Sequence, residues 1–136
     1  MVNREQLISQ VKAKFKLQFG NEPDNITLTP GRINIIGEHT DYNEGFAMPL
    51  AIDRWICVAI CRSNTRSSML ISLNYNKNAI ILPNAPKKNQ AIWKRLAAAS
   101  INVISKEFGI EEGAYMVLGG NIPIGCGLSS SSAFVI

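Results

Sequence analysis

The spacing of hydrophobic and polar residues is helical at the start of the chain, strand-like in the middle and helical again from about residue 90. The apolar residues of the first segment that recur at helical spacing are Leu7, Val11 and Phe15. Asn3 and Gln6 resemble a capping box, and Gly20 is placed to end the helix. The pattern therefore predicts an amphipathic helix between Asn3 and Gly20.

Short apolar segments separated by polar turns predict strands in the middle of the chain. These segments are Ile33–Ile36, Met69–Leu73, Ala79–Leu82 and Ala114–Leu118. The longer segment from Phe46 to Cys61 is apolar and partly β-branched, and we expect it to form a hairpin or a pair of strands.

A second helix is predicted from about Gln90 to Phe108, with Gly109 as its C-terminal cap. Its expected inner face consists of Ile92, Leu96, Ala99, Val103 and Ile104. Ser129–Ile136 has the pattern of a third helix without a stop signal, so we expect the sequence to be part of a longer protein. Strands first and helices interleaved late favour the α+β class.

Composition and charge narrow the function classes. The net charge of +4 is mild, and basic residues with exposed aromatics or a nucleic-acid motif are absent from the sequence, so we expect no nucleic-acid partner. No apolar run is long enough to span a membrane. Cys57 and Cys61 share a strand face without metal-ligand spacing, and an odd cysteine count without a secretory signal favours a cytoplasmic protein.

The segment from Gly119 to Ala133, GGNIPIGCGLSSSSA, carries the clearest chemical signal. Glycines let backbone N–H groups approach a phosphate, and a following helix directs its positive N-terminal end at the anion. A Walker A loop requires a lysine that this segment lacks, and a dinucleotide fingerprint requires Gly or Ala where Ser130 stands. The spacing predicts a phosphate-binding loop of another kind.

Polar groups concentrate between Gly31 and Tyr42 in an otherwise apolar neighbourhood. Arg32 lies on a predicted strand, and Glu38, His39 and Asp41 follow in a tight turn. Carboxylates and imidazole suit a polyol, whose hydroxyls donate and accept hydrogen bonds. A guanidinium suits a phosphoryl group in transfer. Taken singly, each residue has an ordinary structural explanation, and a metal site of Glu38, His39 and Asp41 lacks a convincing ligand geometry.

Together the two segments resemble a known family. The first, PGRINIIGEHTDY from Pro30 to Tyr42, resembles the galactokinase signature. The second, from Gly120 to Ala133, is similar to the phosphate loop of the GHMP kinases, which include galactokinase, homoserine kinase and mevalonate kinase. The resemblance covers the whole chain and the first third of a family member. It implies an α+β N-terminal domain with a mixed sheet backed by helices, ending within the helix after the phosphate loop.

The resemblance also implies domains and roles. Residues 1–55 would form the sugar-binding segment and residues 56–136 the start of the ATP-binding region. Galactose would be held by Glu38, His39 and Asp41, and Arg32 would stabilise the transition state. ATP would be bound by Gly125, Cys126, Gly127, Leu128, Ser129, Ser130 and Ser131, with Ser72 and Trp93 near the nucleotide. Ser131 would face Mg²⁺.

The implied reaction is ATP-dependent phosphorylation of the anomeric hydroxyl of galactose to galactose 1-phosphate. The family's catalytic aspartate would lie beyond Ile136, so we expect the 136-residue chain to be inactive alone and the full-length protein to be monomeric. Two alternatives stay open: an N-acetylgalactosamine kinase, whose branch shares the four serines Ser129–Ser132, and a non-catalytic galactose-sensing regulator. The segment Asp41–Phe46 is closer to the ordinary galactokinase form, and the intact loop favours an enzyme.

Overall fold

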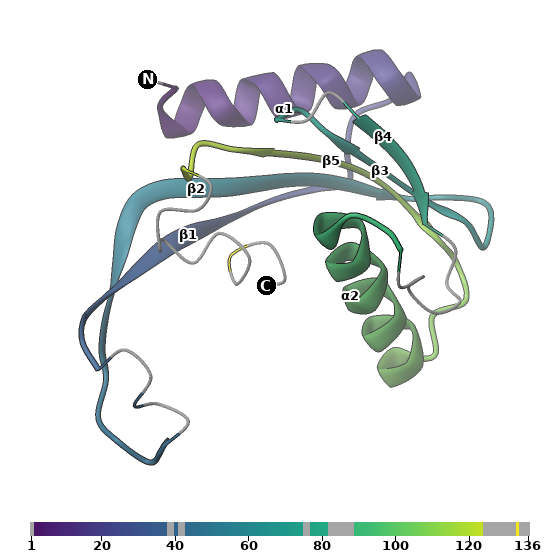
Figure 1. Cartoon of the computed structure of the whole chain (residues 1–136). Helices are drawn as coiled ribbons and strands as arrows, with labels where there is room; N and C mark the ends of the chain where they lie inside the picture. Colours follow the sequence, from purple (N-terminus) through teal and green to yellow (C-terminus); the bar gives the residue numbers. More distant parts are fainter. Residues whose placement is uncertain are drawn as a thin grey trace.

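The computed structural model of the chain describes residues 2–37, 40, 43–74, 77–81, 89–123 and 133, with the backbone alone for residues 77–81. These residues form two helices and a five-stranded sheet (Figure 1). In chain order the elements are α1 (Arg4–Phe19), β1 (Asn25–Ile36), β2 (Met48–Arg62), β3 (Ser68–Ser72), β4 (Lys77–Ile81), α2 (Ile92–Phe108) and β5 (Ala114–Gly120).

The sheet is mixed. Its strand order is β1-β2-β5-β3-β4, with β3 and β5 parallel and every other neighbouring pair antiparallel. The chain between the two parallel strands contains β4 and α2, so α2 belongs to a crossover connection. The expected α+β fold with a mixed sheet backed by helices is therefore confirmed.

The first helix begins and ends where the sequence predicts. The Asn3 amide nitrogen donates to Gln6 Oε1 at 3.1 Å, and the Gln6 amide donates to Asn3 Oδ1 at 2.8 Å, which completes the capping box. Gly20 follows the last turn with a left-handed φ of 79°. The buried residues of α1 are Leu7, Val11 and Phe15.

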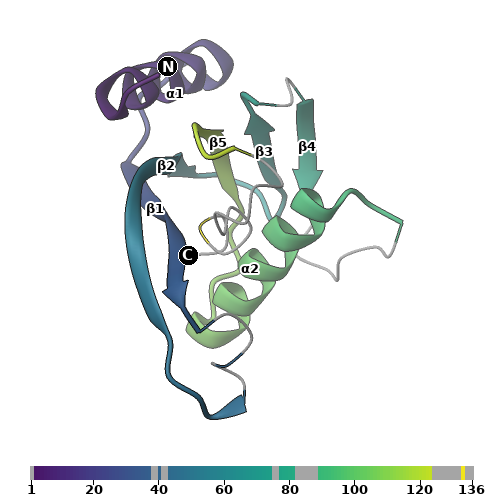
Figure 2. The ribbon, with the colours of Figure 1, turned by 60° about the vertical axis from the view of Figure 1, so that its left-hand side comes forward.

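Each face of the sheet carries its own core, with α1 on one side and α2 on the other (Figure 2). The α1 side includes Cys57 and Cys61, which confirms that both are small buried hydrophobes. Burial raises the pKa of the Cys57 thiol to about 11. Close packing on this side also fixes Gly119, where an added Cβ would lie 2.7 Å from Val11 Cγ2.

The expected hairpin or pair of strands between Phe46 and Cys61 is wrong. The segment forms one continuous strand, β2, because no glycine or turn dipeptide interrupts it. Two polar residues, Asp53 and Arg54, are accommodated as a bulge instead: Pro30 of β1 pairs with Trp55, and the next residue pairs with Ile52.

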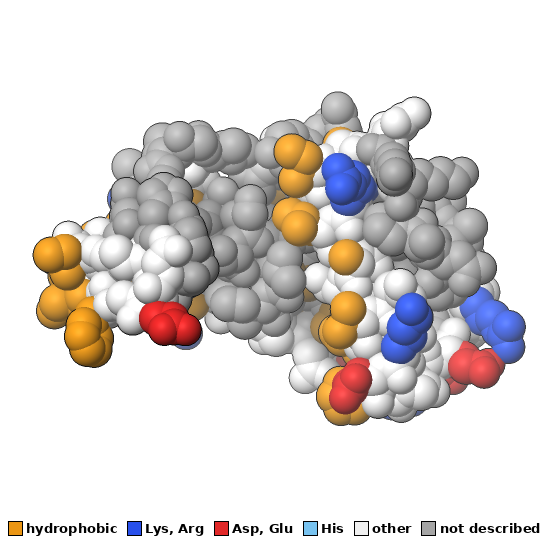
Figure 3. All heavy atoms as spheres, turned by 60° about the horizontal axis from the view of Figure 1, so that its bottom comes forward, with side chains coloured by type: hydrophobic (Ala, Val, Ile, Leu, Met, Phe, Trp, Pro, Cys, Tyr) orange, Lys and Arg blue, Asp and Glu red, His pale blue; other side chains and the backbone are white. Residues whose placement is uncertain are grey.

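The predicted inner face of α2 is also wrong. The residues that face the core are Ala97 and Ala98, with Trp93 and Ile101 packed beside them. Of the five predicted residues only Leu96 is partly buried, and Figure 3 shows hydrophobic side chains along the outside of the helix. Alanines let α2 approach the sheet closely, and apolar residues on both sides of the helix left the pattern ambiguous.

Within the described residues, no helix combines the length and apolarity that crossing a membrane requires.

Candidate functional site

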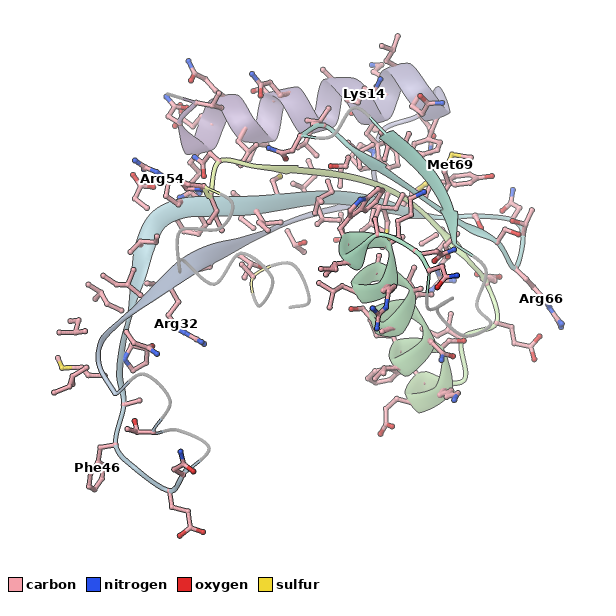
Figure 4. All side chains as sticks on the ribbon, viewed as in Figure 1. Lys14, Arg32, Phe46, Arg54, Arg66 and Met69 are labelled. Atoms are coloured by element: carbon pink, nitrogen blue, oxygen red, sulfur yellow. The ribbon has the colours of Figure 1, made fainter. Side chains whose placement is uncertain are left out.

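Beyond Trp55, β1 and β2 leave the rest of the sheet and continue as a two-stranded ribbon. The pairing of β2 with β5 covers only Ile56–Arg62, whereas its pairing with β1 continues to Met48. Arg32 lies on this ribbon opposite Ala51 and is exposed. Figure 4 shows its side chain on the concave side of the bent ribbon, the side of the sheet on which α2 lies. The predicted transition-state residue is therefore exposed on the α2 side of the sheet.

The loop at the tip of the ribbon is organised by Thr40. Its hydroxyl lies 2.7 Å from the Gly37 carbonyl oxygen and 2.9 Å from that of Phe46, so its single proton is shared between the two ends of the loop. The Thr40 carbonyl in turn accepts from the amides of Asn43 at 3.0 Å and Gly45 at 2.8 Å. The predicted sugar ligands Glu38, His39 and Asp41 belong to this loop but lie outside the described residues.

The predicted nucleotide-binding segment, Asn121 to Ala133, is called the nucleotide segment below and begins where β5 ends. Two asparagine side chains form hydrogen bonds at its start. The Gly120 amide donates to Asn74 Oδ1 at 2.9 Å, and Asn74 Nδ2 donates to the Gly120 carbonyl at 2.8 Å. On the other side, Asn121 is hydrogen-bonded to Trp55 of β2. The start of the segment is thus fixed against strand β2 and the turn that follows β3.

Both flanks of the predicted phosphate loop belong to the α2-side core. Ile122 is 8% exposed and Ala133 is 4% exposed, and both belong to the buried cluster that includes Ala97 and Met116. The predicted loop residues themselves, Gly125 to Ser131, lie outside the described residues. The structure therefore places the two ends of the segment on one side of the sheet, with α2.

Ser72 lies at the end of β3, on the same face as Leu70 and the α2-side core by strand alternation. Its side chain is fully buried, and no described residue is a hydrogen-bond partner of its Oγ. Trp93 is partly buried against the same core, with the Lys94 ammonium 5.5 Å from its ring centroid. Both predicted nucleotide neighbours thus lie on the side of the sheet where Ile122 and Ala133 pack.

Three residues of this region were missed from the sequence: Thr40, Asn74 and Asn121. Their side chains bind backbone groups rather than offering a free functional group, and only Asn121, a polar residue between Gly120 and Ile122-Pro123, carried a local turn signal. Hydrogen bonds that join Asn74 to Gly120, 46 residues apart, have no signature in a single sequence.

The described residues contain no group of three or more His, Cys, Asp and Glu side chains able to hold a metal ion. The predicted Mg²⁺ ligand, Ser131, lies outside them.

Comparison with known proteins supports both segments. The galactokinase galactose-binding signature matches residues 13–62, which include Arg32 and the ribbon loop. The GHMP kinases N terminal domain matches residues 94–136, which include the glycine and serine segment. In both segments the chain is similar to the galactokinases of the GHMP kinase family. A galactokinase of Clostridium perfringens is 35% identical over 130 residues, covering 93% of this chain and 34% of that protein.

Solved structures agree with this family. The crystal structure of Lactococcus lactis galactokinase complexed with galactose matches with a TM-score of 0.80 and 31% identity, covering 93% of this chain and 34% of that chain. Methanococcus jannaschii mevalonate kinase matches with a TM-score of 0.71 and 25% identity, covering 82% of this chain and 37% of that chain. The chain thus spans about a third of the length of these relatives.

Proposed function

We propose that this chain is the sugar-binding segment and the start of the nucleotide-binding region of a galactokinase. The whole protein would transfer the γ-phosphoryl group of ATP to the anomeric hydroxyl of galactose, giving galactose 1-phosphate. One observation carries the proposal: the two motif-bearing segments meet at Trp55. Pro30, at the start of the sugar segment, pairs with Trp55 from one side, and Asn121, at the start of the nucleotide segment, bonds to it from the other.

Roles for individual residues follow from this arrangement and from the family. Arg32 would stabilise the charge that develops on the phosphoryl group, since a guanidinium keeps its charge and offers several donors. The sugar hydroxyls would be bound by Glu38, His39 and Asp41. Gly125 to Ser131 would bind the phosphates of ATP, with Ser131 toward Mg²⁺ and Ser72 near the nucleotide. ATP supplies the phosphoryl group, and the chain's own contribution is to hold and orient the two reactants.

The Ser72 hydroxyl, which has no hydrogen-bond partner among the described residues, supports a polar ligand on the α2 side of the sheet. A buried hydroxyl without a partner costs about 1–3 kcal/mol, so its presence in a core needs a reason. A nucleotide group that reaches Ser72 would supply the missing partner.

Monomeric assembly and a cytoplasmic location also belong to this proposal. Size-exclusion chromatography of the whole protein with light scattering tests the monomeric assembly.

The deciding experiment measures phosphorylation of galactose and of N-acetylgalactosamine by the whole protein with ATP. We expect turnover of galactose, with Glu38→Ala and Asp41→Ala each losing sugar binding while ATP binding is kept. Preference for N-acetylgalactosamine would identify the related kinase. Binding of galactose and ATP without turnover would identify the sensing regulator. Unchanged sugar affinity in both variants would contradict the assigned sugar ligands.

A further inference from the structure

Trp55 lies where the two-stranded ribbon of β1 and β2 leaves the rest of the sheet. On one side of Trp55 the β1–β2 register skips Asp53 and Arg54, and beyond this bulge the ribbon leads to Arg32. The Trp55 side chain is fixed as well: its indole Nε1 donates to Asp53 Oδ1 at 2.7 Å, and the Arg4 guanidinium lies 5.0 Å from its ring centroid. The position of Trp55 therefore determines where the ribbon begins.

Asn121 binds this same residue twice. The backbone N–H of Asn121 donates to the Trp55 carbonyl at 3.0 Å, and the side-chain Oδ1 of Asn121 accepts from the backbone N–H of Trp55 at 2.6 Å. In an antiparallel ladder the backbone carbonyl of Asn121 would accept the second bond. The side chain takes this role, so the ladder that pairs Ile56 with Gly120 is completed while the main chain turns out of the sheet toward Pro123.

A third bond extends the link to the first helix. Asn121 Nδ2 donates to the Val2 carbonyl at 2.9 Å, immediately before the capping residue of α1. The side chain of Asn121 is partly buried, and both of its polar atoms have backbone partners. It therefore bridges β2 and the start of α1 at the residue where the nucleotide segment begins.

We propose that Asn121 is a positioning residue for phosphoryl transfer, which sets the distance between the nucleotide segment and the ribbon that carries Arg32. The inference rests on the proposed function, because it assigns one reactant to each segment. Asn121 touches neither reactant in this scheme and acts through Trp55. Since transfer requires the reacting atoms at near-contact distance, a misplacement of about 1 Å lowers the rate by about 100-fold.

This role differs in its kinetics from that of a residue that only stabilises the fold. Loss of the link displaces one bound reactant relative to the other but removes no contact to either. The Michaelis constants for galactose and ATP should therefore change little, while kcat falls. A residue that only adds stability lowers the amount of folded protein and leaves the kcat of the folded fraction unchanged.

The test compares three variants of the whole galactokinase. Asn121→Ala removes both side-chain bonds. Asn121→Asp keeps an oxygen for the Trp55 amide but loses the donor to Val2. Ser63→Ala is the stability control at the opposite end of β5, because the buried Ser63 hydroxyl lies 2.9 Å from the Thr65 carbonyl and 3.0 Å from that of Ser67.

We expect kcat to fall by about 10- to 100-fold in Asn121→Ala, with both Michaelis constants within about threefold of wild type. Asn121→Asp should recover most of kcat, and its added charge should appear as a salt-dependent rise in the Michaelis constant for ATP. A rise in the Michaelis constant for ATP alone in Asn121→Ala, or an equal loss of kcat in Ser63→Ala, would overturn the proposal.

Hydrogen exchange on the same proteins separates this proposal from the proposed function. Asn121→Ala should speed exchange of the Trp55 amide, whose acceptor is removed, and Ser63→Ala should not. Unchanged exchange at Trp55 would overturn the link itself. A wild-type protein that phosphorylates neither sugar would contradict the proposed function and with it the kinetic role, whatever the exchange at Trp55 shows about the link.

Discussion

A Cβ atom on Gly37 would collide with the carbonyl oxygen of Phe46, so the two ends of the ribbon loop, Gly37 and Phe46, meet through their backbones. The φ of Gly37 is 93°, in the region that residues with a side chain rarely adopt. Both the conformation and the contact require glycine at this position. The meeting of the two loop ends, on either side of the predicted sugar ligands, therefore depends on Gly37.

Gly37→Ala should weaken galactose binding and lower the free energy of unfolding by more than about 1 kcal/mol, since the methyl group displaces the loop ends. Calorimetric titration with galactose and urea unfolding measure the two effects. Gly20→Ala is the matched control, because Gly20 also has a positive φ of 79° but has no atom within 4 Å of an added Cβ. Equal galactose affinity in the two variants would contradict the role of the loop contact.

The Thr40 hydroxyl closes the same loop, and its removal tests the loop without a steric clash. Thr40→Val keeps the shape but loses the bonds to Gly37 and Phe46, which corresponds to about 1 kcal/mol and a roughly fivefold weaker galactose affinity. Thr40→Ser keeps the hydroxyl and should bind as wild type. Faster hydrogen exchange at Gly45 in the valine variant would localise the effect. Equal affinities of the valine and serine variants would refute it.

The sequence predicted the elements of this fold where local chemistry determines them. The first helix followed from its capping box, which joins residues three apart, and from the four-residue spacing of its buried side chains. The single strand from Met48 to Arg62 was missed because a bulge at Asp53 and Arg54 replaces a turn. Its cause is the register of pairing with the preceding strand β1, in which Pro30 pairs with Trp55, and a turn signal within the segment does not show this register.

The candidate site also contains residues that the sequence predicted and residues that it did not. Arg32 and the two motifs were found from their residue types, and the structure places Arg32 exposed on the ribbon. Asn74, Thr40 and Asn121 were not found, because they act by binding the backbone of other segments. The inner face of α2 was misassigned since its buried residues are the small Ala97 and Ala98, which a pattern of large apolar side chains overlooks.

The capping box of α1 gives a prediction about stability alone. Asn3→Ala removes the Oδ1 acceptor of the Gln6 amide and should lower the free energy of unfolding by about 1 kcal/mol. Urea unfolding followed by circular dichroism measures the change. Asn64→Ala, at an exposed position in the turn after β2, is the matched control and should stay within about 0.5 kcal/mol of wild type. An equal loss in both variants would contradict the cap.

The buried thiol of Cys57 should resist alkylation in the folded protein. Its pKa of about 11 keeps it protonated at pH 8, and its side chain is fully buried. Iodoacetamide labelling with mass spectrometry should modify Cys57 only after unfolding in urea. Cys57→Ser should destabilise by about 1–3 kcal/mol by placing a hydroxyl in the core, and Cys57→Ala by less. Rapid labelling of Cys57 in the native protein would contradict its burial.

The ion pair between Lys16 and Glu22 should make stability depend on pH in the acid range. Lys16 Nζ lies 2.9 Å from Glu22 Oε1, and this hydrogen bond lowers the pKa of Glu22 below its ordinary value of 4.5. A lowered folded-state pKa contributes stability above pH 4.5, which is lost as the pH falls through the folded-state pKa.

The comparison of wild type with Glu22→Gln measures this contribution together with that of the second Glu22 pair, in which Lys12 Nζ lies 3.4 Å from Glu22 Oε2. The difference in their free energies of unfolding should be small because the pair is exposed, largest near neutral pH, and should narrow as the pH falls below 4.5. High salt at neutral pH should narrow it as well, because exposed charges are screened. Urea unfolding across the pH range measures the difference. A difference that stays constant from neutral to acid pH would show that the pair contributes nothing through its charge.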